Sequence, residues 1–285
     1  MIRSLILDVD GVLVGDRAGF NFPDPHAKVI AALRAVRQTG VYISLCTAKP
    51  AFAIEKIIQA AHLNNVHITD GGAAIIDPID HDIAAEHSIP KALAADVAGY
   101  YRRQGVYQEF YSPSDYFIIA GTQCDLTAKH ALTLQREPQA VADIDGFLGD
   151  ETVVKLFLIA QDEQEKQHVA RSFAEQFSGS LTLSWTLHPN TLPWQFGIVT
   201  AKGISKQNGA REIAQHLQVP LADILGVGDT AHDWQFIQLC GYAAAMGNAT
   251  GELKAQVMTR GAHGFIAPPV NENGVIEVFR HFGVL

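Results

Sequence analysis

Two carboxylates separated by one residue follow the first apolar run of the chain. The run is Leu5-Ile6-Leu7, and Asp8, Asp10 and Gly11 come after it. Three aliphatic residues without alternation are typical of a strand buried on both faces, as in a parallel sheet covered by helices. Because such sheets bind ligands at the carboxyl ends of their strands, we expect Asp8 and Asp10 at the mouth of a crevice. The alternative is an exposed turn, which Asp and Gly also favour.

A second apolar run, residues 224–228, also ends in an acid. Asp229 follows it, and Asp233 comes four residues later, which places both carboxylates on one face of a first helical turn. Magnesium prefers oxygen ligands and is usually held by one or two carboxylates plus a substrate phosphate. We expect Asp8, Asp229 and the backbone carbonyl of Asp10 to hold Mg²⁺, with Asp233 bound directly or through water. Alternatively, these acids are ordinary residues of a helix start.

Two further residues are candidate phosphate ligands. Lys206 opens a predicted helix after Ser205, and Thr47 ends a predicted strand just before another helix. A lysine ammonium, a hydroxyl and helix N-terminal amides are common partners of phosphate. Each residue also has a plainer interpretation, as a solvated surface lysine and a turn threonine.

The elements that must position these residues alternate between strand and helix at both ends of the chain. Near the N-terminus we predict helices over residues 24–38 and 50–61 and strands over 41–46 and 66–69, which is typical of βαβ units. Near the C-terminus we predict helices over 205–217 and 230–239 and strands over 224–228 and 242–246.

The middle of the chain has a different rhythm, with strands that follow one another. The predicted elements there are helices over 90–103 and 163–177 and strands over 107–111, 116–120, 153–160, 181–186 and 194–199. We therefore predict an α/β protein: a doubly wound, Rossmann-like parallel sheet built from residues 1–84 and 197–285, with an inserted α+β cap of residues 85–196.

Composition restricts the class of protein. The 285 residues are 48% hydrophobic and carry a net charge of −9, which argues against disorder and against a broad nucleic-acid surface. The three cysteines lack disulfide or CxxC spacing, and we find no leader or run of about 18–20 apolar residues. We expect a cytoplasmic protein, a monomer or homodimer, with no membrane or nucleic-acid partner.

Taken in order, the motifs resemble those of the haloacid dehalogenase superfamily. They are Asp8-Val9-Asp10-Gly11-Val12, Thr47, Lys206 and Gly228-Asp229-x-x-x-Asp233. The tracts Gly203-Ile204-Ser205-Lys206 and Ala245-Met246-Gly247-Asn248-Ala249 are similar to its sugar-phosphatase-like branch, the Cof-like group with a class IIB cap. That branch carries its cap between the second and third motifs, where the insert is predicted here.

The resemblance implies a role for each matching residue. Asp8 would be the nucleophile that forms an aspartyl-phosphate, and Asp10 the general acid and then the base. Thr47 and Lys206 would hold the phosphoryl oxygens, and Asp229 with Asp233 would hold magnesium. The implied function is a magnesium-dependent phosphatase of a small phosphorylated metabolite, with a sugar phosphate as the expected substrate. A phosphomutase of the same superfamily and a non-catalytic phosphometabolite-binding protein are the alternatives.

Three positions depart from the family pattern. His232 stands where the family has Asn, Thr47-Ala48-Lys49 replaces Thr-Gly-Arg, and Asp70-Gly71-Gly72-Ala73 replaces Asn-Gly-Ala. His232 either contacts Lys206 or the substrate, or is a helix histidine without a role.

Substrate specificity is predicted to come from the cap, near residues 185–194. His188 is the candidate for substrate contact, and Trp194 is either a second contact or a residue of the cap's own core.

Overall fold

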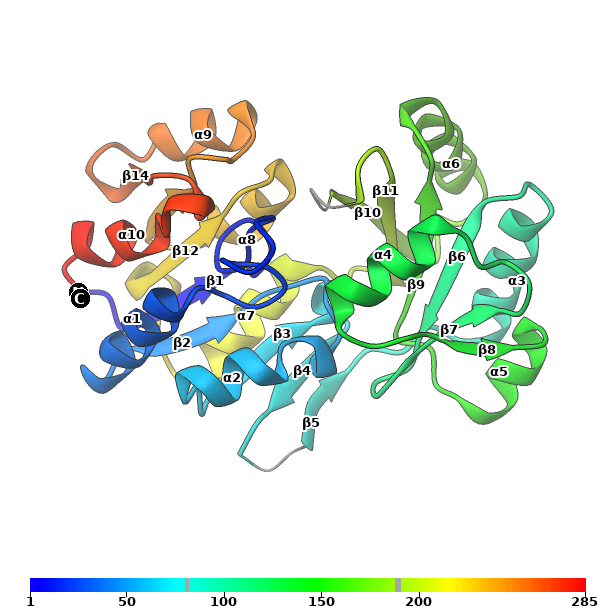
Figure 1. Ribbon diagram of the computed structural model, residues 1–285, viewed down its shortest axis with the longest axis horizontal. Coiled ribbons are helices and arrows are strands. Elements are labelled where there is room, and N and C mark those ends of the chain that lie inside the picture. The colour runs from blue at the N-terminus through cyan, green and yellow to red at the C-terminus, as the bar shows by residue number, and fades with distance from the viewer. Residues whose placement is uncertain (80–81, 188–190) are drawn as a thin grey trace.

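The computed structural model describes residues 1–79, 82–187 and 191–285, and its strands form three sheets (Figure 1). The core sheet runs in the order β14-β13-β12-β1-β2, with every neighbouring pair parallel. Its strands are β1 (Ser4–Leu7), β2 (Tyr42–Leu45), β12 (Ile224–Gly228), β13 (Tyr242–Ala245) and β14 (Gly264–Ile266). The prediction of an α/β protein with a parallel core sheet is confirmed.

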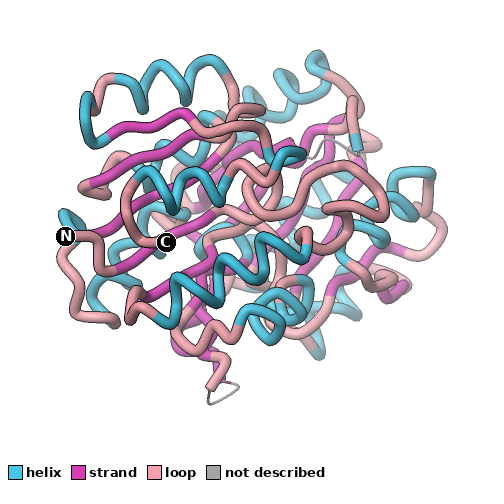
Figure 2. Tube along the Cα trace, turned by 60° about the vertical axis from the view of Figure 1, so that its left-hand side comes forward, coloured by secondary structure: helices cyan, strands magenta, loops and turns pink. Residues whose placement is uncertain are grey.

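Helices cover both faces of the core sheet, as the tube of Figure 2 also shows. Leu5 and Leu7 of β1 pack on one face, and Ile6 packs on the other, because successive side chains of a strand point to opposite faces. The helices of the first face are α1 (Ala27–Gln38), α2 (Glu55–Ala61) and α10 (Val275–His281). Those of the second are α7 (Lys206–His216), α8 (Trp234–Ile237) and α9 (Gly251–Met258).

A small antiparallel sheet extends from the edge of the core sheet. It consists of β3 (His67–Thr69), β4 (Ala74–Asp77) and β5 (Asp82–Glu86), and a parallel bridge between Cys46 and Ile68 joins it to the chain after β2. The chain turns between β3 and β4 at Asp70–Gly72. This turn therefore lies beside the carboxyl end of β2.

The cap sheet has six strands in the order β10-β11-β9-β6-β7-β8, and all neighbours are antiparallel except β7 and β8. The strands are β6 (Tyr107–Tyr111), β7 (Tyr116–Ile119), β8 (Gln139–Val141), β9 (Lys155–Ala160), β10 (Leu181–Leu187) and β11 (Gln195–Ala201). The helices α3 (Lys91–Arg102), α5 (Ile144–Asp150) and α6 (Glu163–Gln176) pack on one face.

The other face of the cap sheet, with helix α4 (Asp125–Leu134), lies toward the core sheet (Figure 1). Tyr111, Phe157 and Phe196 of the cap sheet share one apolar cluster with Ala73 and Leu126. Gln135, which follows the last residue of α4, donates to Asp24 Oδ1 at 2.8 Å and accepts from Lys56 Nζ. The cap sheet and α4 are thus in contact with the core.

Several elements were not predicted. The polar stretch after residue 120 forms α4, β8 and α5, and the sheet strands β4 and β5 fill the region between residues 70 and 90. The predicted helix over 230–239 is a 3₁₀ turn, Ala231–Asp233, followed by the short α8. The boundary predicted at residue 196 falls within β11, which continues to Ala201, and the two-part division of the chain stays a prediction.

Among the described residues, no helix has the length and apolar character that a membrane span requires. The oligomeric state and the cytoplasmic location stay predictions.

A buried ion pair joins the cap sheet to the turn between β3 and β4. Lys155 Nζ, at the start of β9, lies 2.9 Å from Asp70 Oδ1 and donates to the carbonyl of Ala48 at 2.7 Å. The exposed fractions of the two charged side chains are 0% and 1%. The ammonium also lies 3.7 Å from the centre of the Tyr111 ring. Since burial removes both charges from water, each depends on the other for compensation.

Replacing one partner of this pair is therefore expected to lower the stability of the protein far more than replacing both. Lys155→Met leaves the Asp70 carboxylate buried without its cation and should lower the free energy of unfolding by about 3–5 kcal/mol. Lys155→Met combined with Asp70→Asn should recover a large part of that loss. Urea unfolding of both variants measures the difference, with the exposed Lys129→Met as a control that should change stability by less than about 0.5 kcal/mol. Equal destabilisation of single and double variants would contradict the pairing.

Candidate active site

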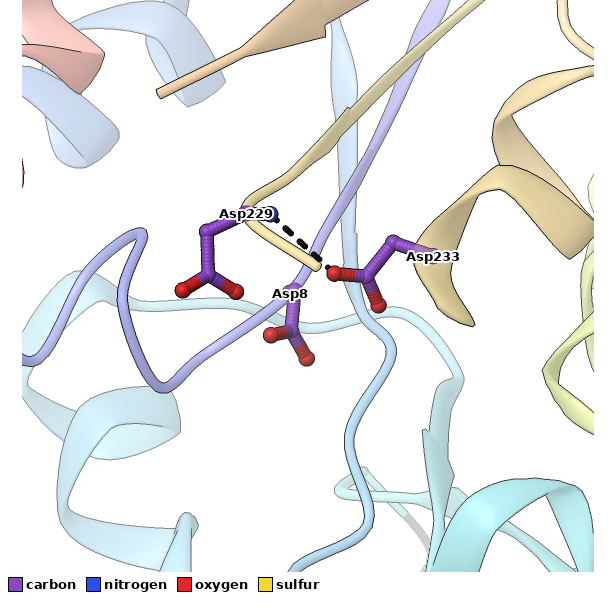
Figure 3. A group of neighbouring side chains, drawn as sticks. All are labelled: Asp8, Asp229 and Asp233. Carbon is purple, nitrogen blue, oxygen red and sulfur yellow. Dashed lines mark hydrogen bonds between the residues drawn. The ribbon is translucent and has the colours of Figure 1, made fainter. Parts of the chain in front are cut away.

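The acidic residues predicted to meet at the carboxyl edge of the core sheet do meet there. β1 pairs with β12 on one side and β2 on the other, so Asp8, Asp229 and Thr47 follow adjacent parallel strands. Oxygen atoms of Asp8, Asp229 and Asp233 all lie within 4.8 Å of one another. Figure 3 shows the three carboxylates gathered around one point.

Lys206 connects two of these carboxylates. Its Nζ, from the first residue of α7, donates to Asp8 Oδ1 and to Asp233 Oδ1, both at 2.7 Å. Burial opposes the positive charge, but the carboxylates of Asp233 and Asp8 outweigh it and raise the pKa of Lys206 well above its ordinary value. Lys206 is therefore a permanent cation beside Asp8.

Asp233 also closes the turn after β12. Its Oδ2 accepts from the backbone N–H of Asp229 at 3.1 Å (Figure 3). It also accepts from the backbone N–H of Thr230 at 3.0 Å and from the Thr230 hydroxyl at 3.1 Å. Although burial opposes ionisation, Lys206 and these hydrogen bonds lower the pKa of Asp233. The four-residue spacing from Asp229 thus has a structural cause, and both oxygens of Asp233 are engaged by protein donors.

The site has more carboxylates than ammonium groups, and this excess of negative charge favours a bound cation. Burial raises the pKa of Asp8 to about 7, and the charge of Asp233 adds to this effect. Burial and the charges of Asp233 and Asp8 raise the pKa of Asp229 well above its ordinary value. A divalent cation among these oxygens would relieve both effects, and an all-oxygen donor set suits a hard ion. The residues present therefore fit Mg²⁺.

Gly11 leaves the room that Asp229 needs. Its φ is +78°, and a Cβ at this position would lie 2.0 Å from Asp229 Oδ2. Asn248 donates to the Gly11 carbonyl at 2.9 Å and to Asp229 Oδ2 at 3.4 Å. Gly11 is thus required by the close approach of the Asp229 carboxylate as well as by the turn that follows β1.

Sequence reasoning missed the role of Lys49. Its Nζ lies 2.8 Å from Asp10 Oδ1, and only 6% of its side chain is exposed. In the sequence Lys49 stands out only as a departure from the family's arginine, and its place two residues after Thr47 is the signal that identifies it as a cation of the site. The backbone of this loop is held by Asp70 N–H donating to Lys49 O and Gly71 N–H donating to Thr47 O, both at 3.0 Å.

These groups face one cavity of about 50 Å³. Asp8, Asp10, Thr47, Lys206 and Asp229 line it, as predicted for a common site. Its other lining residues are Ala48, Lys49, Pro50, Thr230 and, from the cap sheet and α4, His130, Thr133, Leu134, Phe157, Thr186 and Phe196. A cavity this small brings any bound molecule against the cap residues.

The residues predicted to set specificity are placed differently. Trp194 lines a separate cavity with Arg102 and Gln161, so its assignment to specificity gains no support from the site geometry. His232 is half-buried; burial and the charge of Lys206 lower its pKa to about 4, so it is neutral at pH 7. His188 lies outside the described residues.

Comparisons with known proteins give consistent results. The family model for haloacid dehalogenase-like hydrolases matches residues 5–279. Phosphatase YwpJ of Bacillus subtilis is 23% identical and covers 92% of this chain and 97% of its own length. HMP-PP phosphatase of Cronobacter sakazakii is also 23% identical, over 90% of this chain and 88% of its own length.

A solved structure of a sugar phosphatase of haloacid dehalogenase subclass IIB has the same fold. It superposes with a TM-score of 0.80 at 23% identity and covers 99% of this chain and 100% of its own. Because the family model spans nearly the whole sequence, the chain belongs to the haloacid dehalogenase-like hydrolases and is an enzyme of their phosphatase type.

Proposed function

We propose that this chain hydrolyses a small phosphorylated metabolite, with a sugar phosphate as the expected class, through an aspartyl-phosphate on Asp8 and with Mg²⁺ as cofactor. The observation that carries the proposal is the contact of 2.7 Å between Lys206 Nζ and Asp8 Oδ1, in a cavity that Asp10 and Thr47 also line. A carboxylate, a second carboxylate and a fixed ammonium are the groups that displacement at phosphorus requires.

The attack of Asp8 on the phosphate requires that the repulsion between their negative charges be offset. A carboxylate that approaches a phosphate dianion meets roughly 4 kcal/mol of repulsion per charge pair at 4 Å and an effective dielectric near 20. Lys206 beside Asp8 and Lys49 beside Asp10 offset part of it. Asp8 and Asp229, with the backbone carbonyl of Asp10 and with Asp233 bound directly or through water, would hold Mg²⁺, which would neutralise further charge on the phosphoryl oxygens.

Asp8 and Asp10 divide the chemistry. Asp8 Oδ forms a bond to phosphorus as the ester oxygen leaves, and Asp10 gives that oxygen a proton. Asp10 then takes a proton from water, which attacks the aspartyl-phosphate, releases inorganic phosphate and restores Asp8. Thr47 and Lys206 hold the phosphoryl oxygens throughout. Transfer to a second hydroxyl would instead make the enzyme a mutase, and release of inorganic phosphate distinguishes the two.

Loss of the nucleophile should abolish turnover without unfolding the protein. Asp8→Asn keeps the shape of the side chain but removes its nucleophilic oxygen, and phosphate release from a panel of phosphorylated metabolites should fall by roughly 10⁴-fold or more. Asp96→Asn, an exposed residue of α3, is the matched control and should keep full activity. Substantial phosphate release by folded Asp8→Asn would refute the assignment.

Removal of divalent metal should stop the reaction. EDTA is expected to abolish phosphate release, and added Mg²⁺ to restore it. Without a divalent cation, the negative charges of Asp8 and Asp229 are not fully compensated by positive groups of the protein. Asp229→Asn should raise the Mg²⁺ concentration that gives half-maximal activity, whereas Asp96→Asn should not. Full activity in metal-free buffer would count against the metal site.

The acid role of Asp10 predicts a dependence on the leaving group. Asp10→Asn should slow hydrolysis of alkyl phosphates by about 10²–10⁴-fold, since their alkoxides need a proton. Formation of the aspartyl-phosphate from an aryl phosphate, measured as a burst of the released phenol, should be affected less. If both kinds of ester lose the same factor in that step, Asp10 is not the acid.

A further inference from the structure

The cap sheet holds a buried carboxylate–histidine pair that the proposed chemistry does not use. Glu109, in the middle of β6, has an exposed fraction of 0%. Its carboxylate lies 2.9 Å (Oε1) and 2.8 Å (Oε2) from Nδ1 of His130 on α4. The Tyr111 hydroxyl donates to Glu109 Oε2 at 2.6 Å. Burial and the Glu109 charge raise the pKa of Tyr111 well above its ordinary value, so Tyr111 remains a donor.

These contacts fix which edge of the imidazole is left for a ligand. A carboxylate accepts hydrogen bonds, so Nδ1 carries the proton toward Glu109 and Nε2 is the nitrogen left for another partner. The ring is held by Phe196, with centroids 4.9 Å apart, and by Phe157, at 5.9 Å. His130 is therefore oriented by both polar and apolar neighbours.

The same histidine lines the cavity that contains Asp8, Asp10 and Lys206. Among the described lining residues of the cap sheet and α4, it is the one with a titratable side chain; the others are threonine, leucine and phenylalanine. The core residues of the cavity bind the phosphoryl group in the proposed reaction. The cap residues on the other side of the cavity therefore face the alcohol half of a phosphate ester. An imidazole nitrogen that stands among threonine, leucine and phenylalanine side chains favours a polar atom at one position of the ligand.

We propose that His130 determines specificity by hydrogen bonding, through Nε2, to an oxygen substituent on the alcohol half of the substrate, and that Glu109 and Tyr111 are positioning residues for it. The substrate class is a phosphate monoester whose alcohol carries a hydroxyl or a carboxylate near the phosphate. The inference rests on the proposed phosphatase function, because it needs the ester to lie with its phosphoryl group at Asp8.

The test compares esters that differ in one substituent. The probes are 2-hydroxyethyl phosphate and phosphoglycolate, each against ethyl phosphate, with para-nitrophenyl phosphate as a generic substrate. The wild-type enzyme should prefer at least one oxygen-bearing ester over ethyl phosphate by about 10–100-fold in kcat/KM, the range expected for one or two hydrogen bonds. Which of the two is preferred tells whether a hydroxyl or a carboxylate is bound.

Two substitutions separate the two edges of the ring. His130→Asn places an amide near Nδ1, which keeps a donor for Glu109, and removes the Nε2 edge. It should reduce the preference to less than about threefold, because kcat/KM falls more for the oxygen-bearing esters than for ethyl phosphate. His130→Gln places an amide near Nε2 and should keep part of the preference. His168→Asn, at an exposed site on α6, is the matched control and should change neither value.

Tyr111→Phe provides a variant that keeps the buried ring while removing one hydrogen bond to Glu109. It should lower the preference by an intermediate factor, with a smaller effect on para-nitrophenyl phosphate than on the preferred ester, and it tests the inference even if His130→Asn does not fold. An unchanged preference in both variants, an equal loss for all esters, or no preference in the wild type would overturn the inference while phosphate release continues. No release by the wild type from any of these esters would overturn the phosphatase proposal itself.

Discussion

One ammonium group holds the acidic site together. Lys206 comes from the start of α7, yet its Nζ contacts carboxylates that follow β1 and β12, at 2.7 Å each. Without this cation, three carboxylates with oxygen atoms within 4.8 Å of one another would repel one another in a buried position. The position of α7 against the carboxyl edge of the core sheet therefore determines whether Asp8 is available as an anion. The raised pKa of Asp8, about 7, indicates that Lys206 alone does not complete the compensation.

Much of this arrangement could be predicted from the order of motifs along the chain. Buried strands that end in Asp8 and Asp229 belong to one parallel sheet, and parallel topology alone brings their ends together. The roles of Lys49 and Lys155 could not be predicted in this way, because their partners, Asp10 and Asp70, are set by loop conformation and by the docking of the cap sheet. Local sequence patterns carry no information about contacts between residues that are 39 or 85 positions apart in the numbering, as these two pairs are.

The cap was harder to predict than the core for a related reason. Its polar stretch after residue 120 contains α4, whose exposed residues obscure the helical pattern of the buried Leu126, His130 and Leu134. Sequence reasoning placed specificity at His188 and Trp194, on the basis of aromatic and imidazole chemistry, and overlooked a histidine within that polar stretch. What distinguishes His130 is its partner Glu109, twenty-one positions earlier and buried within a strand, and this pairing is visible only once β6 and α4 pack together.

Two departures from the family pattern, Asp70 and the segment Ala48-Lys49, are connected through contacts of Lys155. Asp70, where the family has Asn, would be an uncompensated buried charge without Lys155, and Lys155 belongs to the cap sheet. The same ammonium binds the carbonyl of Ala48, in the loop that positions Thr47 and Lys49. In the proposed mechanism the cap thus contributes to the phosphate side of the site through Lys155 and to its alcohol side through His130. Since both residues depend on the seating of one sheet on the core, displacement of the cap would loosen the Thr47–Lys49 loop and remove the imidazole together. The proposed reaction therefore depends on the contacts of the cap sheet as well as on the acidic residues of the core.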